Sequence, residues 1–193
     1  MKICVYGAAS PTIDAEFFSK TEILGEKMAL RGHSLVFGGG ACGLMGAVAK
    51  GVKNKNGSIL GVIPKFFDEH EIEVVCNFCD KLIKPQTMRE RKQIMEDNSD
   101  AFIVTPGGIG TFEEFFEILT LKQLCRHNKP IAIFNINGYY DEIIVALKKA
   151  VEKNFVRNEC LSLFKVFDDA DKLLDYIEAP VTDIKSVKEL KNG

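Results

Sequence analysis

The stretch Ala101-Phe102-Ile103-Val104-Thr105-Pro106-Gly107-Gly108-Ile109-Gly110-Thr111 decides how this sequence folds. Its four apolar residues at 101–104 predict a short buried strand, and the helical pattern of 110–126 follows almost at once. The glycines between them allow a tight turn and a close approach by a ligand. A helix N-terminus has unpaired N–H groups and a positive dipole end, which favour an anion. The stretch therefore predicts a strand, a phosphate-binding turn and a helix in succession.

The start of this helix has a second interpretation. Thr111-Phe112-Glu113-Glu114 fits the capping box T-x-x-E, in which Thr111 caps the helix and Glu114 reaches back to the backbone. Capping boxes are ordinary helix starts, so the local pattern alone favours neither interpretation. The run of glycines upstream favours a functional role, because a cap does not need such a run.

Strands and helices alternate along the rest of the chain as well. Apolar strands are expected at 2–6, 34–37, 59–63, 101–104, 131–134 and 165–167, and helices at 13–31, 43–53, 86–98, 110–126, 139–153 and 169–178. This alternation predicts an α/β fold, a single Rossmann-like domain whose parallel sheet is flanked by helices on both faces. Ligands bind such sheets beyond the carboxyl ends of the strands.

The boundaries of this domain follow from the same pattern. We expect one nucleotide-binding domain over residues 1–180 and a polar C-terminal tail over 181–193 that frays. Residues 65–85 indicate a mixed loop with short strand-like runs. In the helix at 13–31, the inward positions are expected to be Phe17, Leu24, Met28 and Leu30.

Composition excludes several classes of protein. The 193 residues are 46% hydrophobic and 27% charged, which is typical of a globular domain, and the net charge of −2 gives no bulk attraction to nucleic acid or to an anionic membrane. No apolar run approaches the roughly 20 residues that span a bilayer. The chain starts directly with a strand, which favours the cytoplasm. A phosphate ligand must therefore be held by local groups.

The cysteines and histidines do not indicate a metal site or a cofactor. The six cysteines are mostly in apolar contexts, where free thiols act as small buried hydrophobes. Cys76 and Cys79 form a lone C-x-x-C without the second pair that a structural zinc site needs. The three histidines are scattered singly. We expect two free thiols at a strand edge, no metal and no cofactor.

A second glycine-rich segment follows the strand at 34–37. Gly38-Gly39-Gly40-Ala41-Cys42-Gly43 satisfies G-x-G-x-x-G, but the next strand ends at Pro64-Lys65 with no acid to hold a ribose. This disfavours a dinucleotide and favours a turn that allows close packing of helix and strand, and a mononucleotide remains open. No G-x-x-x-x-G-K-[ST] occurs, so the chain is not a P-loop NTPase.

The helix before the strand at 101–104 carries Met88-Arg89-Glu90-Arg91-Lys92. Arg91 could bind a phosphate through its planar fork and Lys92 as a point charge. A charge run is more often a solvated helix face. Pairing with the glycine-rich helix start on the neighbouring helix favours the functional interpretation.

Together, the two blocks resemble the LOG (Lonely guy) family of cytokinin-activating phosphoribohydrolases. The family signature is P-G-G-x-G-T-x-x-E preceded by an R-K pair on a helix, and Pro106 to Glu114 match it in full. The resemblance also takes in the opening strand and the glycines at 38–46, and it runs from Lys2 to about Ile177. Family members have been labelled possible lysine decarboxylases, but nothing in this sequence independently indicates a pyridoxal phosphate site.

The resemblance implies hydrolysis of the N-glycosidic bond of a nucleoside 5′-monophosphate, which gives a free adenine-type base and ribose 5-phosphate. It implies a catalytic carboxylate at Glu114 and a catalytic arginine at Arg91 that holds Glu114 or the substrate. The implied contacts with the 5′-phosphate run along the turn, at Gly107, Gly108, Ile109, Gly110 and Thr111. Further implied substrate-binding positions are Ser10, Met88, Lys92, Glu113 and Thr120. The family also forms homodimers.

Two questions stay open in the sequence. An acid among Glu69, Glu71 and Glu73 is expected to touch the substrate, and the loop at 66–84, where Cys76 and Cys79 match no family motif, leaves adenine and prenylated adenine as alternative bases. A protein that binds nucleotide without turning it over is the alternative function. It is less favoured, because a binder has no need of a carboxylate that opposes the phosphate electrostatically.

Overall fold

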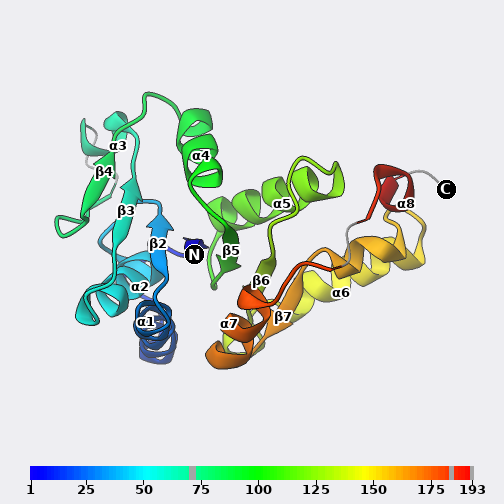
Figure 1. Ribbon diagram of the computed structural model, residues 1–193, viewed down its shortest axis with the longest axis horizontal. Coiled ribbons are helices and arrows are strands. Elements are labelled where there is room, and N and C mark those ends of the chain that lie inside the picture. The colour runs from blue at the N-terminus through cyan, green and yellow to red at the C-terminus, as the bar shows by residue number, and fades with distance from the viewer. Residues whose placement is uncertain (70–72, 183–184, 192–193) are drawn as a thin grey trace.

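A seven-stranded parallel sheet forms the centre of the molecule in the computed structural model, which describes residues 1–69, 73–182 and 185–191. The strand order is β4-β3-β2-β1-β5-β6-β7, and every neighbouring pair is parallel (Figure 1). The strands are β1 (Lys2–Tyr6), β2 (Ser34–Phe37), β3 (Ile59–Val62), β4 (Lys81–Ile83), β5 (Ala101–Val104), β6 (Ile131–Phe134) and β7 (Lys165–Phe167). The predicted α/β class with one parallel sheet is confirmed.

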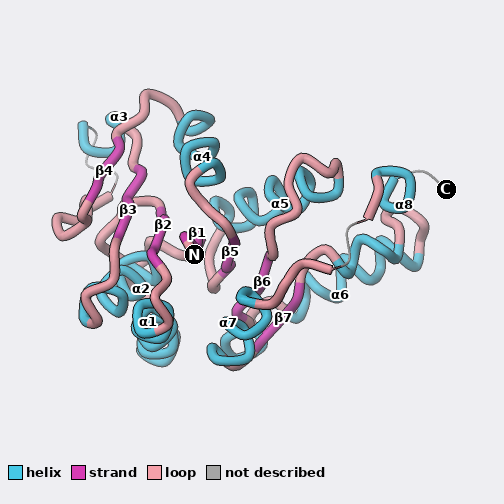
Figure 2. Tube along the Cα trace, in the orientation of Figure 1, coloured by secondary structure: helices cyan, strands magenta, loops and turns pink. Residues whose placement is uncertain are grey.

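Helices lie on both sides of this sheet (Figure 2). They are α1 (Ala15–Leu30), α2 (Gly43–Asn54), α3 (Lys65–Glu69), α4 (Met88–Asp97), α5 (Ile109–Gln123), α6 (Asp141–Glu152), α7 (Ala170–Glu178) and α8 (Val187–Lys191). Successive strand residues point to opposite faces, so Ile3 and Val5 pack with α1, α2 and α7 in one core. Cys4 and Tyr6 pack with α4, α5 and α6 in the other. None of the helices in the described residues is long and apolar enough to cross a bilayer.

Helices α1 and α2 pack unusually closely because two glycines lie at their contact. A Cβ added at Gly25 would lie 2.3 Å from the carbonyl oxygen of Val48, and one at Gly51 would lie 2.0 Å from that of Glu22. Any larger residue would force the two backbones apart. This pair of glycines therefore fixes the layer beneath β1 and β2.

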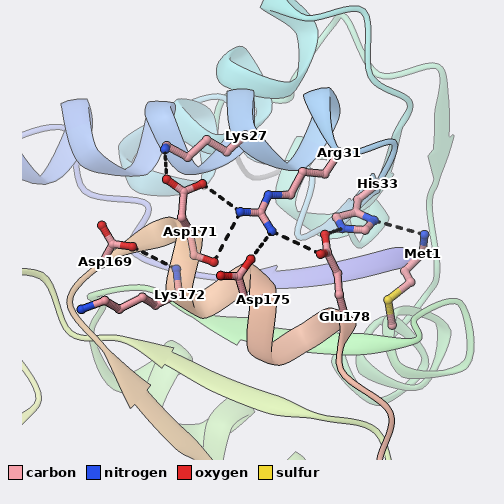
Figure 3. A network of polar contacts seen from close by, with 9 residues as sticks. All are labelled: Met1, Lys27, Arg31, His33, Asp169, Asp171, Lys172, Asp175 and Glu178. Carbon is pink, nitrogen blue, oxygen red and sulfur yellow. Dashed lines mark hydrogen bonds and ion pairs between the residues drawn. The ribbon is translucent and has the colours of Figure 1, made fainter.

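A polar network joins the end of α1 to α7 (Figure 3). The guanidinium of Arg31 lies 2.9 Å from Asp171, 2.7 Å from Asp175 and 3.2 Å from Glu178. Lys27 also pairs with Asp171. His33 lies 2.7 Å from the other oxygen of Glu178. The network ties the last helix that covers the sheet to the first.

The structure differs from the sequence-based expectations in three places. Leu30 was expected to face inward but is 70% exposed as the last residue of α1. Residues 65–85, expected as a mixed loop with short strand-like runs, contain the edge strand β4 as one such run, but they begin with the helix α3, which was not expected. The C-terminal segment, expected to fray, contains α8, whose Leu190 is 1% exposed.

The strand order reverses direction at β1. Strands β2, β3 and β4 extend to one side of β1, and β5, β6 and β7 extend to the other. The carboxyl ends of β1 and β5 therefore lie side by side, with the turns that start at Gly7 and Pro106 directly beyond them. This is the position at which open α/β sheets bind ligands.

Candidate functional site

The turn after β5 leaves the N-terminus of α5 open. Gly108 is the N-cap residue, and no side chain of the described residues caps it. Ile109 is 87% exposed, and a Cβ added at Gly108 or Gly110 would meet nothing within 4 Å. Unpaired helix N–H groups facing open space are suited to an anion. The turn therefore has the geometry that phosphate binding requires, and phosphate binding stays a prediction.

The alternative interpretation of this turn, a capping box from Thr111 to Glu114, is wrong. The helix begins two residues before Thr111, which lies 4% exposed within its first turn. The glycines let the chain enter the helix early, so Thr111 cannot be the cap. A true capping box occurs instead at the start of α4, where Thr87 and Glu90 bond each other's backbone N–H groups.

Hydrogen bonds hold the backbone of the turn in place. The hydroxyl of Tyr139 donates to the carbonyl of Gly107 at 2.6 Å, and that of Tyr140 donates to the carbonyl of Thr105 at 2.8 Å. The N–H of Ala8 donates to the carbonyl of Pro106 at 3.0 Å, which joins the turns after β1 and β5. The open N–H groups therefore project from a fixed frame.

Arg91 and Glu114 lie together beneath this frame. The side chain of Arg91 comes from α4 and that of Glu114 from α5, and Nη1 lies 3.7 Å from Oε1. Arg91 is 6% exposed and Glu114 is 9% exposed. The guanidinium is oriented by two strand ends, because Nε donates to the carbonyl of Val62 at 3.1 Å and Nη2 donates to that of Gly38 at 3.3 Å. The structure thus brings together the two residues predicted to be catalytic.

Burial changes the acidity of Glu114. It raises the pKa of this carboxyl to about 7, although the nearby charge of Arg91 acts in the opposite direction. The burial cost is the larger effect because the Arg91 contact is longer than a hydrogen bond. A carboxyl with a pKa near 7 can exchange a proton at neutral pH, as general acid–base catalysis requires.

Glu73 is a third group at this site, and the sequence left it open among three acids. Its Oε2 atom is buried and has no hydrogen-bond partner among the described residues. A Cβ added at Gly40 would lie 2.6 Å from that oxygen, so the carboxylate faces the turn after β2. Burial raises the pKa of Glu73, and Arg91 opposes this rise. Of the other two acids, Glu71 and the side chain of Glu69 lie outside the described residues.

Backbone pairing holds the Glu73 segment against the sheet. Val75 forms an isolated antiparallel bridge with Gly40. The N–H of Ala41 donates to the carbonyl of Val74 at 2.7 Å, and the N–H of Cys76 donates to that of Gly39 at 2.8 Å. Nothing in the local sequence signals this pairing, because its two halves are more than thirty positions apart.

The other predicted substrate-binding residues are placed less uniformly. Lys92 pairs with Glu113, and its Nζ lies 2.8 Å from Glu117. Met88 is 36% exposed at the start of α4, and the Ser10 hydroxyl is exposed, 3.1 Å from that of Thr12. Thr120 is exposed on α5, nine residues beyond Thr111, which is about 13 Å along a helix axis. The structure therefore does not bring Thr120 to the turn within one chain.

The glycine-rich segment after β2 serves packing. The second and third N–H groups of α2, at Leu44 and Met45, both donate to the carbonyl of Ala8, at 2.8 and 3.3 Å. Gly43 has a φ of 62°, and a Cβ there would lie 2.2 Å from the same oxygen. Because the protein itself uses this helix N-terminus, the structure supports the packing interpretation of G-x-G-x-x-G over the dinucleotide one.

The C-x-x-C pair lies in the loop between α3 and β4. Cys76 is buried and Cys79 is half-buried, and both are free thiols. The hydrogen bond from the Cys79 thiol lowers the pKa of Cys76 to about 7, and the same bond raises the pKa of Cys79. Within the described ranges, no group of three or more His, Cys, Asp or Glu side chains could hold a metal ion.

Comparison with known proteins gives the site a context. Residues 45–177 match a family described as "Possible lysine decarboxylase". The Arabidopsis thaliana protein named cytokinin riboside 5′-monophosphate phosphoribohydrolase LOG2 is 34% identical over 177 residues, which cover 92% of this chain and 82% of that protein. LOG5 from the same plant, named for the same activity, is 34% identical over 184 residues, covering 94% of this chain and 80% of that protein.

Solved structures agree with the fold. The Moco carrier protein of Chlamydomonas reinhardtii superposes with a TM-score of 0.68 at 20% identity, covering 92% of this chain and 94% of that chain. The molybdenum cofactor binding protein of Rippkaea orientalis also superposes at 0.68 and 20% identity, covering 92% and 93%. At this identity, the likeness shows a shared architecture.

Proposed function

This chain belongs to the LOG family, and we propose that it hydrolyses the N-glycosidic bond of a nucleoside 5′-monophosphate of the adenine type. The products are the free base and ribose 5-phosphate. The observation that carries the proposal is the buried Arg91–Glu114 pair beside an uncapped, glycine-rich helix N-terminus. The names of the relatives that the chain matches over most of its length support it.

The phosphate end of the nucleotide binds at the turn. Its negative charge faces the free N–H groups of residues 108–111 and the positive end of the α5 dipole. Gly108 and Gly110 present no side chain in the way. Binding there fixes the ribose over the start of α5, where Glu114 is less than one turn beyond Thr111.

The carboxylates act on the ribose carbon that holds the base. As the bond to the base breaks, positive charge develops on the ribose, as in glycoside hydrolysis. Ionised Glu114 stabilises that charge or takes a proton from the attacking water. The water oxygen bonds to the ribose carbon, and its proton ends on the base nitrogen. Arg91 keeps the Glu114 carboxylate in position, and Glu73 supplies a second negative group beside it.

The remaining residues form the periphery of the site. Lys92 pairs with Glu113 and Glu117 at the rim and offsets part of their negative charge, while Ser10 and Met88 form walls. The reaction requires no metal or cofactor. We place it in the cytoplasm, on a free nucleotide rather than on nucleic acid or a membrane.

The proposal includes a homodimer formed through α5. Ile109, Glu113, Phe116 and Thr120 recur at helical spacing on one exposed face, where Ile109 is 87% and Phe116 is 41% exposed. Exposed apolar side chains grouped on one face are typical of an interface. A second copy on this face also brings Thr120 toward a neighbouring site. Light scattering should show a dimer for the wild type and a monomer for Phe116→Glu.

A chromatographic assay tests the activity. The protein is incubated with adenosine 5′-monophosphate and, separately, with its isopentenylated analogue, and free base is measured. Glu114→Gln is run beside wild type and beside Glu142→Gln, which removes the charge of an exposed carboxylate on α6. Release of base by wild type and Glu142→Gln, but not by Glu114→Gln, supports the proposal. Binding of both nucleotides without release of base would indicate a nucleotide-binding protein instead.

A further inference from the structure

A separate cavity lies at the opposite edge of the sheet from the nucleotide site. It has a volume of about 450 Å³. Pro130, directly before β6, and Lys165, the first residue of β7, line it, so it lies at the amino ends of these strands. The nucleotide site follows the carboxyl ends of β1 and β5, so the cavity is not part of it.

The end of α5 and the C-terminal segment form two walls of this cavity. Lys122 and Cys125 line it from the first wall, and Pro180, Val181 and Leu190 from the second. Hydrogen bonds join these walls, because the thiol of Cys125 donates to the carbonyl of Lys185 at 3.2 Å and the amide of Gln123 donates to that of Leu190 at 3.3 Å. The space is therefore closed by specific contacts rather than by chance proximity.

Lys122 is the unusual residue of this cavity. It is only 8% exposed, and within the described part of the chain its side-chain ammonium forms no hydrogen bond or ion pair. Burial lowers its pKa to about 8. Lys92, one of the other poorly exposed lysines, pairs with two carboxylates. A buried ammonium without a counter-charge is costly, so Lys122 lacks the partner that its position calls for.

The rest of the lining is positive or neutral. Lys165 also lines the cavity, and no Asp or Glu is among its lining residues in the described ranges. His127 is neutral because its Nε2–H donates to the carbonyl of Ile118 at 2.9 Å, while Nδ1 accepts from the N–H of Lys129 at 3.2 Å. Burial lowers the pKa of this imidazole to about 4. The cavity therefore attracts negative charge.

One side of the cavity is apolar. Pro130, Leu163 and Tyr176 line it beside the hydroxyl groups of Ser162 and Thr182. Small-molecule sites have volumes of about 300–1,000 Å³ and combine an apolar wall with a few polar groups. Both the size and the lining agree with a small ring-bearing ligand.

We propose that this cavity binds a small organic anion, with a phosphate or carboxylate group on Lys122 and a flat apolar body against Tyr176 and Leu163. The anion supplies the counter-charge that Lys122 lacks, and the ring displaces water from the apolar wall. The proposal is independent of the reaction at the nucleotide site, because it uses none of that site's residues.

Titration of the full-length, isotopically labelled protein, followed through its backbone amide NMR signals, tests the proposal. The probes are phenyl phosphate and benzoate, with benzyl alcohol as the neutral control. At least one anion should shift the amides of Leu163, Lys165 and Val181 saturably, and benzyl alcohol should bind at least about tenfold more weakly. The two anions show which head group the cavity prefers.

The variants decide the role of the lysine. Lys122→Met and Lys122→Gln should weaken binding of the preferred anion at the cavity about tenfold or more, while Lys148→Met, which removes an exposed charge on α6, should not. Lys122→Gln serves as the decisive variant if the Met variant does not fold. Shifts confined to Gly107–Thr111, equal binding of the alcohol, or unchanged affinity in the folded Lys122 variant would overturn the proposal.

Discussion

Replacing Glu114 by glutamine should have opposite effects on activity and stability. A general acid–base group contributes about 10²- to 10⁴-fold to a reaction rate, so Glu114→Gln should release base at least about 100-fold more slowly than wild type. The amide cannot take a proton or balance positive charge on the ribose. The substitution should nevertheless stabilise the fold above neutral pH, because it removes a charge that is buried at a cost.

The size of the stability gain follows from the carboxyl's acidity. Burial raises the pKa of Glu114 from 4.5 to about 7, despite the attraction of Arg91. Each tenfold change in proton affinity is worth about 1.4 kcal/mol, so ionised Glu114 costs the folded state about 3 kcal/mol. The folded state with protonated Glu114 avoids this cost. That advantage in the free energy of unfolding is fully present below pH 4.5 and is lost as the pH rises through about 7. The hydrogen bonds from Arg91 to the carbonyls of Val62 and Gly38 do not involve Glu114, so we expect them to persist in the variant.

Two measurements check this reasoning. Denaturant unfolding at a series of pH values should show wild type and Glu114→Gln equally stable near pH 4.5, with a gap of about 3 kcal/mol in favour of the variant above pH 8. The wild-type kcat/KM should fall as the pH drops below about 7, because that ratio follows ionisation of the free enzyme. A stability gap that does not change with pH, or a variant as active as wild type, would refute the argument.

Four further substitutions are expected to have separate effects. A Cβ at Gly107 would lie 2.1 Å from the Thr111 hydroxyl, so Gly107→Ala should destabilise the protein by about 1–3 kcal/mol. Gly108→Ala should unfold at the same temperature as wild type. In a calorimetric titration, however, it should bind nucleotide more weakly. Arg31→Met should lower the melting temperature by about 2–4 °C in scanning calorimetry, and 1 M salt should shrink the difference by roughly half or more if the network is electrostatic. Glu73→Gln should reduce kcat/KM about tenfold or more in the base-release assay while leaving the protein folded, and unchanged kinetics would remove Glu73 from the mechanism.

The sequence by itself determined the order of the elements and the position of the glycine-rich turn between β5 and α5. Runs of four or five apolar residues bounded by glycine and proline are typical of buried strands, and their alternation with helical patterns favours a covered parallel sheet. Proximity of Arg91 and Glu114 was also predictable, because both residues belong to one family pattern. These features depend on local periodicity and on motifs, which sequence alone contains.

The tertiary structure decided what depends on residues far apart in the chain. Whether Thr111 or Gly108 is the N-cap of α5 depends on how the chain enters the helix from β5, which the local pattern could not determine. The selection of Glu73 depends on backbone pairing with the turn after β2. The raised pKa of Glu114 and the lowered pKa of Lys122 both come from burial by several elements at once. Desolvation is a property of the whole packed molecule, so no stretch of sequence specifies it alone.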